Sequence, residues 1–283
     1  MRLIECPRDA MQGIKTKIPT NLKIKYINTL LRVGFNIIDF GSFVSKLAIP
    51  QMSDTQEIID NLYLSDTNTQ LLSIVGNLKG AQNLIKNKDI KYIGFPFSIS
   101  NTFLKLNINS TIEKSLNRLN DIIDISIPYD KNIIVYISMS FGNPYEDMWN
   151  VDLLLDYIDR LSDMGINDIN ISDTMGFSTP ESIELVFNSV INEYPDIHFG
   201  FHLHTNNNWY NKIRSAYISG VRSFDSVIGG VGGCPMTGYE LVKNLNTIDL
   251  IDFCFDNDIE LKLDEKWLKK SIDLSNFIYD KYK

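Results

Sequence analysis

Short apolar segments alternate with longer amphipathic segments from one end of the chain to the other. The apolar segments have the length and the residue types of strands, whereas the segments between them have helical periodicity. This alternation is typical of repeated βα units and predicts an α/β protein with a (β/α)₈ TIM barrel. The expected strands are 3–6, 36–40, 70–75, 91–95, 133–138, 168–171, 197–203 and 223–227.

Helices are expected between these strands, for example over 21–33, 110–125, 151–164, 180–193 and 208–219. Several of them end at a glycine, at Gly34, Gly165 and Gly220, as is usual just past a helix C-terminus. We expect a single catalytic domain over 1–283, with the barrel over about 1–258 and an additional C-terminal helical tail over about 259–283.

Composition narrows the possible partners. The 283 residues carry a formal net charge of -8, which argues against a nucleic-acid groove and against a membrane-surface role. The cysteines Cys6, Cys234 and Cys254 are odd in number and widely spaced, which suits a reducing compartment. No apolar signal segment and no run of transmembrane length is evident, so a cytoplasmic protein is expected.

Two of the three histidines, His202 and His204, lie at the end of the seventh expected strand. Side chains alternate with period two along a strand, so both imidazoles should leave the same face and could bind one divalent metal ion. The alternative is a strand whose histidines are merely hydrogen-bonded or solvated. His198 has the same parity but would lie about 20 Å from His204 at a rise of ~3.3 Å per residue, which indicates a structural role.

Polar residues follow several of the other expected strands. In a TIM barrel the reactive groups come from the C-terminal ends of different strands, so such residues should converge at one mouth. They occur at 6–9, 39–42, 173–174, 202–204 and 229–234.

Six of these motifs together resemble the 3-hydroxy-3-methylglutaryl-CoA lyase family. They are PRDAMQ at 7–12, SFVS at 42–45, PQM at 50–52, SDTMG at 172–176, HLH at 202–204 and GGVGGCP at 229–235. The resemblance extends from the first strand to about residue 253. It implies a metal-dependent lyase of leucine degradation that cleaves 3-hydroxy-3-methylglutaryl-CoA into acetyl-CoA and acetoacetate. It also implies an acyl-CoA substrate and a homodimer.

The resemblance implies four metal ligands, Asp9, His202, His204 and Asn244. Imidazole nitrogens with carboxylate and amide oxygens form a mixed site that suits Mg²⁺ or Mn²⁺, whereas zinc more readily uses a thiolate. The alternatives are a helix or turn cap for Asp9 and a surface helix position for Asn244.

The family roles extend to the chemistry. The resemblance implies that Arg8 stabilises the enolate of acetyl-CoA and that Cys234 transfers a proton from a glycine-rich loop, while His202 or Asp39 serves as the base. The alternatives are a structural salt bridge for Arg8 and a small buried residue for Cys234. The matching residues that contact substrate or support the ligands are Gln12, Ser42 and Asp173.

The chain departs from the family pattern at four places. Asp39 stands where glutamate is usual, Gly13 and Ile14 replace Asn-Glu, Ile248 replaces a glutamate, and segment 236–244 is one residue longer. These changes leave the exact acyl-CoA substrate open. The rival functions are a condensing synthase of the same larger family that acts on a 2-oxo acid, and a barrel that binds metabolites without catalysis.

Overall fold

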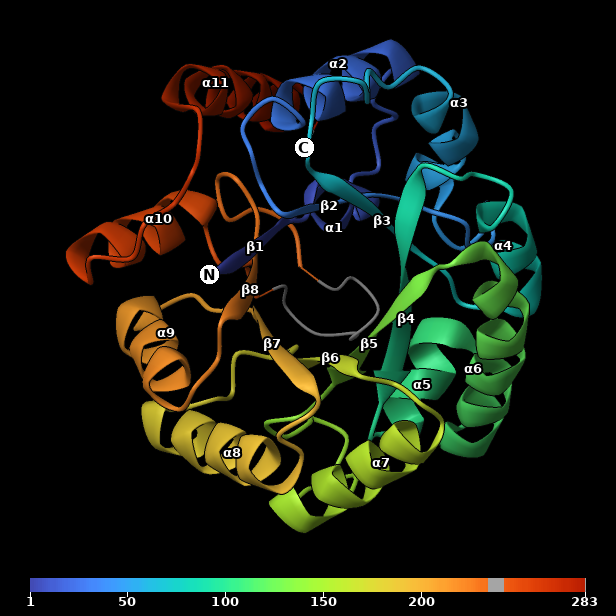
Figure 1. Ribbon diagram of the computed structural model, residues 1–283, viewed down its shortest axis with the longest axis vertical. Helices are drawn as coiled ribbons and strands as arrows, with labels where there is room; N and C mark the ends of the chain where they lie inside the picture. Colours follow the sequence, from blue (N-terminus) through green and yellow to red (C-terminus); the bar gives the residue numbers. More distant parts are fainter. Residues whose placement is uncertain (234–241, 283) are drawn as a thin grey trace.

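The computed structural model describes residues 1–233 and 242–282. Eight parallel strands form a closed barrel in sequence order, and β1 pairs with β8 to complete it (Figure 1). The predicted TIM barrel is therefore confirmed. The strands are β1 Arg2–Glu5, β2 Ile37–Ser42, β3 Gln70–Ile74, β4 Ile90–Ser98, β5 Asn132–Ser138, β6 Asp168–Asp173, β7 His198–Leu203 and β8 Ser223–Ser226.

Helices surround the barrel as an outer ring (Figure 1). They are α1 Pro7–Gln12, α2 Thr20–Leu30, α3 Thr55–Ile59, α4 Leu78–Leu84, α5 Asn101–Ile108, α6 Ile112–Ser126, α7 Val151–Asp163, α8 Pro180–Glu193, α9 Trp209–Ile218, α10 Thr247–Asp256 and α11 Glu265–Tyr282. Two short 3₁₀ helices, η1 Pro50–Met52 and η2 Ile127–Tyr129, lie in connections. No helix among the residues described is long and apolar enough to span a membrane.

Local sequence explains where several helices begin and end. Asn150 caps α7, and Thr179 forms a reciprocal capping box with Ser182 at the start of α8. Gly34 and Gly165 have φ values of +98° and +83°, a left-handed conformation that glycine adopts without a steric penalty. The predicted glycine stops are confirmed at Gly165 and Gly220, which follow the C-caps of α7 and α9. Helix α2 instead ends at Leu30, and Gly34 lies in the turn after it. The additional C-terminal helix is also confirmed, because α11 packs against α2 outside the barrel (Figure 1).

Strand β4 is longer than the sequence predicts. It continues past the expected end at residue 95 through Pro96 to Ser98. The reason is its neighbour, because β5 pairs with β4 residue by residue up to Ser98 and Ser138. Tertiary pairing therefore overrides the proline, whose missing N–H would otherwise favour the end of a strand.

The barrel interior is polar at its N-terminal end. Arg2 of β1 reaches across to β6 and donates to both oxygens of Asp168 at 2.6 and 2.8 Å. Its Nε donates to Ser223 of β8 at 2.8 Å. Such a planar, two-bonded arginine holds the carboxylate in one orientation. This end of the interior can therefore bury Arg2 and Asp168 because each neutralises the other.

Glu5, the last residue of β1, is fully buried without a cationic partner among the described residues. Its carboxyl accepts hydrogen bonds from the Ile228 amide at 2.9 Å and from the Thr247 hydroxyl at 2.6 Å. Burial raises the pKa of Glu5 to about 8, although both hydrogen bonds act in the opposite direction. The side chain is therefore mostly protonated at neutral pH, and it links β1 to the start of α10.

We expect this carboxyl to make folding stability depend on pH. The pKa of Glu5 in the folded protein lies above its ordinary value, so its stabilising contribution is complete at low pH and is lost as the pH rises toward 8. Urea unfolding of Glu5→Gln should therefore show a gain in stability over wild type that grows between about pH 5 and about pH 8, by several kcal/mol at most. Exposed Glu193→Gln is the control. A pH-independent difference for Glu5→Gln would contradict this expectation.

Candidate metal centre and active site

The candidate site lies where the C-terminal ends of several strands meet. Asp9 is in α1, directly after β1, while His202 and His204 lie at the end of β7. All three line one cavity of about 730 Å³, together with Arg8 and Gln12. This is the end of a TIM barrel at which active sites occur.

The two histidine rings point at one centre. Their Nε2 atoms are 3.0 Å apart, which confirms that both imidazoles leave the same face of β7. The ligand atoms of Asp9, His202 and His204 all lie within 4.8 Å of one another. Two ligand atoms at ~2.1 Å from one ion, at right angles to each other, would be about 3.0 Å apart. The spacing therefore fits a shared divalent cation.

Asp9 is held by three donors. Its Oδ1 accepts from Arg8 at 3.0 Å and from Gln12 at 2.7 Å, and its Oδ2 accepts from the Asn244 amide at 2.9 Å. Burial alone would raise the pKa of Asp9, but the Arg8 charge and the neighbouring groups outweigh it and lower that pKa. Asp9 is therefore an oriented carboxylate, as a metal ligand must be.

The two histidines differ from each other in their hydrogen-bond partners and in their pKa shifts. The Nδ1 of His202 lies 2.8 Å from Asp225, whose second oxygen accepts from Asn170 at 2.8 Å. Burial would lower the pKa of His202, but the hydrogen bond and charge of Asp225 raise it. Burial and the nearby His202 lower the pKa of His204 to about 4, so its imidazole is neutral. A carboxylate on one ring nitrogen directs the other toward a metal.

A second group of possible ligands, Cys6, His202 and Asp225, also lies within 4.8 Å. Burial raises the pKa of the Cys6 thiol well above its ordinary value, so it stays protonated. Neither Cys6 nor Asp225 lines the cavity, whereas Asp9 and His204 do. The cluster of Asp9 with the two histidines is therefore the one that a metal ion and a substrate can share.

Arg8 is fixed from behind by a buried carboxylate. Its Nε donates to Asp39 at 2.9 Å, and its Nη2 also bonds the same oxygen. Its Nη1 donates to Gln12 at 2.8 Å as well as to Asp9. Burial raises the pKa of Asp39 to about 6, against the effect of Arg8. Asp39 does not line the cavity, so its described contacts orient the guanidinium.

The three expected substrate-binding residues lie in different settings. Gln12 lines the cavity, but Ser42 and Asp173 do not. The Ser42 hydroxyl donates to a backbone carbonyl of β3 at 3.3 Å. Asp173 accepts from the Phe177 and Ser178 amides at 2.9 and 3.0 Å and so orders the turn after β6. A substrate contact for these two residues stays a prediction.

Asn244 reaches the cluster from the segment after β8. It forms an isolated β-bridge with His204, and its amide donates to the Val231 carbonyl at 2.9 Å as well as to Asp9. Its side chain thus lies beside the expected ligands. Cys234 lies outside the described residues.

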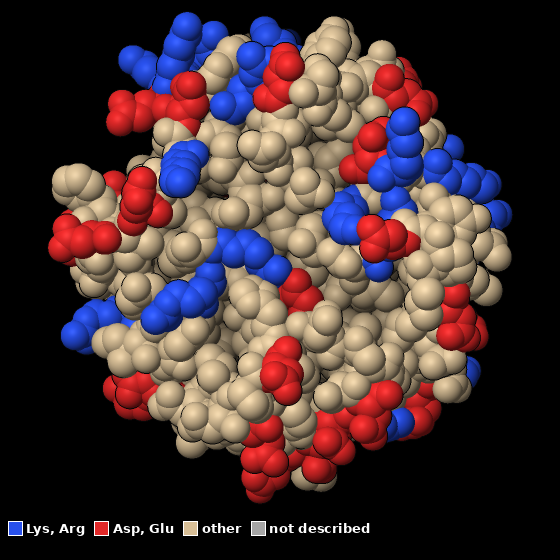
Figure 2. Space-filling model, viewed as in Figure 1, with Lys and Arg blue, Asp and Glu red and all other residues tan. Residues whose placement is uncertain are grey.

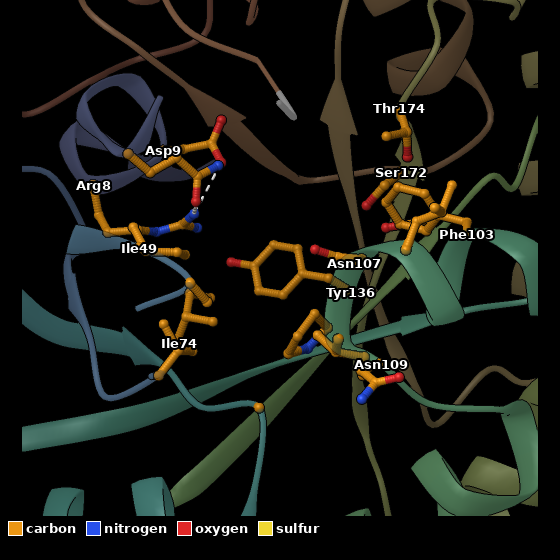
Figure 3. A pocket seen from close by; sticks show the side chains of 18 of the residues that line it. Arg8, Asp9, Ile49, Ile74, Phe103, Asn107, Asn109, Tyr136, Ser172 and Thr174 are labelled. Atoms are coloured by element: carbon orange, nitrogen blue, oxygen red, sulfur yellow. Dashed lines mark hydrogen bonds and ion pairs between the residues drawn. The ribbon is translucent and has the colours of Figure 1, made fainter. Parts of the chain in front are cut away.

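The cavity also contains residues that the sequence did not single out. The close-up in Figure 3 shows Tyr136, Phe103, Asn107 and Asn109 around it, and Arg118 of α6 is a further lining residue. The parity of β5 could have indicated Tyr136, because it lies two residues before Ser138 at the end of that strand. Nothing in the local sequence of α6 marks Arg118.

Charge on the outer surface is mixed. On the face seen in Figure 2, Lys and Arg side chains alternate with Asp and Glu around the rim, and the lower edge is mainly acidic. The ordered charges at the metal cluster are therefore local, and they differ from the general surface.

These features define a (β/α)₈ barrel with a cluster of one carboxylate and two histidines that could hold a metal ion. A family model described as HMGL-like matches residues 4–244, and the chain belongs to this family. It is 32% identical to a cytoplasmic 3-hydroxy-3-methylglutaryl-CoA lyase of Rattus norvegicus, over 81% of this chain and 66% of that protein. It is 30% identical to a mitochondrial hydroxymethylglutaryl-CoA lyase of Gallus gallus, over 96% of this chain and 90% of the relative.

Solved structures agree with this assignment. An HMG-CoA lyase from Acinetobacter baumannii in complex with coenzyme A and 3-methylmalate superposes with a TM-score of 0.90 at 25% identity, covering 99% of this chain and 90% of that one. The chain spans 66% of the length of the cytoplasmic relative from rat and 90% of the length of the mitochondrial relative from Gallus gallus.

The metal cluster can be tested with a matched pair of histidine variants. His204→Ala should lower Mn²⁺ affinity at least about 100-fold, because it removes one nitrogen of the pair. His198→Ala, on the same strand but outside the cavity, should bind Mn²⁺ like wild type. Calorimetric titration of the metal into each protein measures the difference. Equal affinity in the two variants would argue against the cluster.

Proposed function

We propose that this protein is a metal-dependent carbon–carbon lyase that cleaves 3-hydroxy-3-methylglutaryl-CoA into acetyl-CoA and acetoacetate. The observation that carries the proposal is the convergence of Asp9, His202 and His204 beside the fixed guanidinium of Arg8 at one cavity. Membership of the HMGL-like family and the lyase relatives support it.

The donor set suits Mg²⁺ or Mn²⁺. Two imidazoles and a carboxylate would hold the ion. The oxygen of the Asn244 amide, whose nitrogen donates to Asp9, would be the fourth ligand. Bound there, the ion supplies Lewis acidity, which acidifies a substrate hydroxyl and orients it. His204 is neutral and Asp9 ionised before any metal binds, so neither ligand has to lose a proton.

Arg8 acts on the leaving acetyl-CoA. As the carbon–carbon bond breaks, the electron pair moves into the thioester and charge develops on its oxygen. Arg8 stabilises that oxygen best when its orientation is set in advance, and Asp39, Asp9 and Gln12 set it through four hydrogen bonds. Asp39 does not line the cavity and thus supports the reaction through Arg8. The base that takes the hydroxyl proton, His202 or Asp39 by resemblance to the family, stays a prediction.

Cys234 returns a proton to the acetyl carbon. The support comes from the sequence, which puts this thiol directly after Gly232 and Gly233. Gly232 has φ +84°, and a Cβ there would lie 2.7 Å from Ala10 Cα and 3.0 Å from the Asp9 carbonyl. Only glycine allows the chain to pass so close to the metal ligand two residues before the thiol.

The substrate is an acyl thioester of coenzyme A. The cavity continues from the metal cluster to Asn107, Asn109 and Arg118, which leaves room for a thioester beyond the reacting atoms. The related bacterial lyase contains coenzyme A in its complex. We further infer a single catalytic domain over 1–283, a homodimer and a cytoplasmic location, with neither nucleic acid nor membrane as a partner.

One incubation tests this function. Purified protein with Mn²⁺ or Mg²⁺ and 3-hydroxy-3-methylglutaryl-CoA should yield acetyl-CoA and acetoacetate, identified by mass. Chelator should abolish the products, and added metal should restore them. His204→Ala from the same preparation controls for contaminating activity. Turnover that persists in metal-free protein, or no turnover with metal, would reject the proposal.

Arg8→Lys tests the role of the guanidinium. Lysine keeps the charge but cannot bond Asp39, Asp9 and Gln12 in one plane. We expect kcat to fall on the order of 100-fold or more, with Mn²⁺ affinity near that of wild type. Steady-state kinetics and metal titration measure the two effects separately. An unchanged kcat would remove Arg8 from the chemistry.

A further inference from the structure

Tyr136 of β5 occupies the middle of the cavity. Figure 3 shows its ring between the two walls, with the hydroxyl directed toward the side where Arg8, Ile49 and Ile74 lie. Its ring stands edge-to-face with that of His202, at a centroid distance of 5.8 Å and an interplanar angle of 90°. Tyr136 therefore packs against His202 of the metal cluster, with its hydroxyl on the side of the cavity where Arg8 lies.

The Tyr136 hydroxyl is buried and has no hydrogen-bond partner among the described residues. Most buried polar groups in folded proteins are paired, because an unpaired one loses its bonds to water without replacement. Phenylalanine at position 136 would avoid this unpaired hydroxyl, which lowers the folding stability of the protein without ligand. Such an atom in a substrate cavity indicates a partner that arrives with the ligand.

The surroundings define the chemistry of that partner. A phenol hydroxyl carries its proton at neutral pH and can donate a hydrogen bond. Beside it, Ile49 and Ile74 offer no donor, so an oxygen bound on this side of the cavity can bond only Arg8 and Tyr136 among these four side chains.

We propose that the Tyr136 hydroxyl donates a hydrogen bond to an oxygen of the bound acyl group, next to Arg8, and is a substrate-contacting residue of this site. This inference rests on the proposed lyase function. The neutral hydroxyl of Tyr136 is then a second hydrogen-bond donor to the substrate, beside the charged guanidinium of Arg8. A cavity with a buried donor also discriminates against acyl groups that lack the matching oxygen, because the donor is then left unpaired.

A purely structural tyrosine would behave differently, and the chain offers a matched control. The hydroxyl of Tyr279 in α11 is likewise buried with no partner among the residues described, but Tyr279 does not line the cavity. Phenylalanine at either position removes one unpaired hydroxyl. Both variants should therefore fold as stably as wild type or more so, and only one should affect the substrate.

The test compares wild type, Tyr136→Phe and Tyr279→Phe, each loaded with Mn²⁺. We expect Tyr136→Phe to lose about 10- to 100-fold in kcat/KM for 3-hydroxy-3-methylglutaryl-CoA, the effect of one hydrogen bond to a charged oxygen. Its affinity for Mn²⁺ and for free coenzyme A should equal that of wild type. Tyr279→Phe should match wild type in all three measurements.

Each outcome separates the inference from the function. Wild-type turnover with an equally active Tyr136→Phe overturns the role of Tyr136 and leaves the lyase function standing. Loss of Mn²⁺ affinity or of thermal stability in Tyr136→Phe also overturns it, because the residue would then support His202. If wild type does not turn over, the proposed function is rejected. The Tyr136 contact is then tested by calorimetric titration of the acyl-CoA and of free coenzyme A into wild type and Tyr136→Phe. Equal affinities of wild type and Tyr136→Phe for the acyl-CoA would then reject the contact.

Discussion

The parallel pairing of β1 with β8 is the constraint on which the site depends. Asp9 follows the first strand and Asn244 follows the last, and they are 235 positions apart in the chain. Barrel closure brings them within 2.9 Å, beside the histidines of β7. Because all strands run in one direction, their C-terminal ends meet at one mouth. The metal cluster can exist only after the two ends of the barrel have joined.

One guanidinium connects the parts of this mouth. Arg8 bonds Asp39 of β2 and Asp9 of α1, so the proposed metal ligand and the proposed anion-stabilising group share one hydrogen-bond network. Removing either carboxylate would leave a buried positive charge with fewer partners, which is costly. Orientation and stability are therefore coupled here, whereas the substrate side of the cavity retains an unpaired hydroxyl at Tyr136.

Burial also sets the protonation states on which the chemistry depends. It lowers the pKa of His204 to about 4, which keeps a nitrogen lone pair available, and it raises that of Glu5 to about 8, which keeps a structural carboxyl protonated. Asp9 is equally enclosed, yet its neighbours keep it ionised. The two buried carboxyls Glu5 and Asp9 thus differ in protonation because only Asp9 has positively charged neighbours.

Much of this arrangement follows from the sequence by itself. Alternating apolar and amphipathic segments determine the eight strands, and the period of two in β7 determines that His202 and His204 share a face. Other features were decided only by the tertiary structure: Asp225 behind His202, Asp39 behind Arg8, and Tyr136 in the cavity. Parity tells which side of its own strand a residue occupies. It does not tell which side chains from other strands lie opposite, because stagger and closure of the barrel set those contacts.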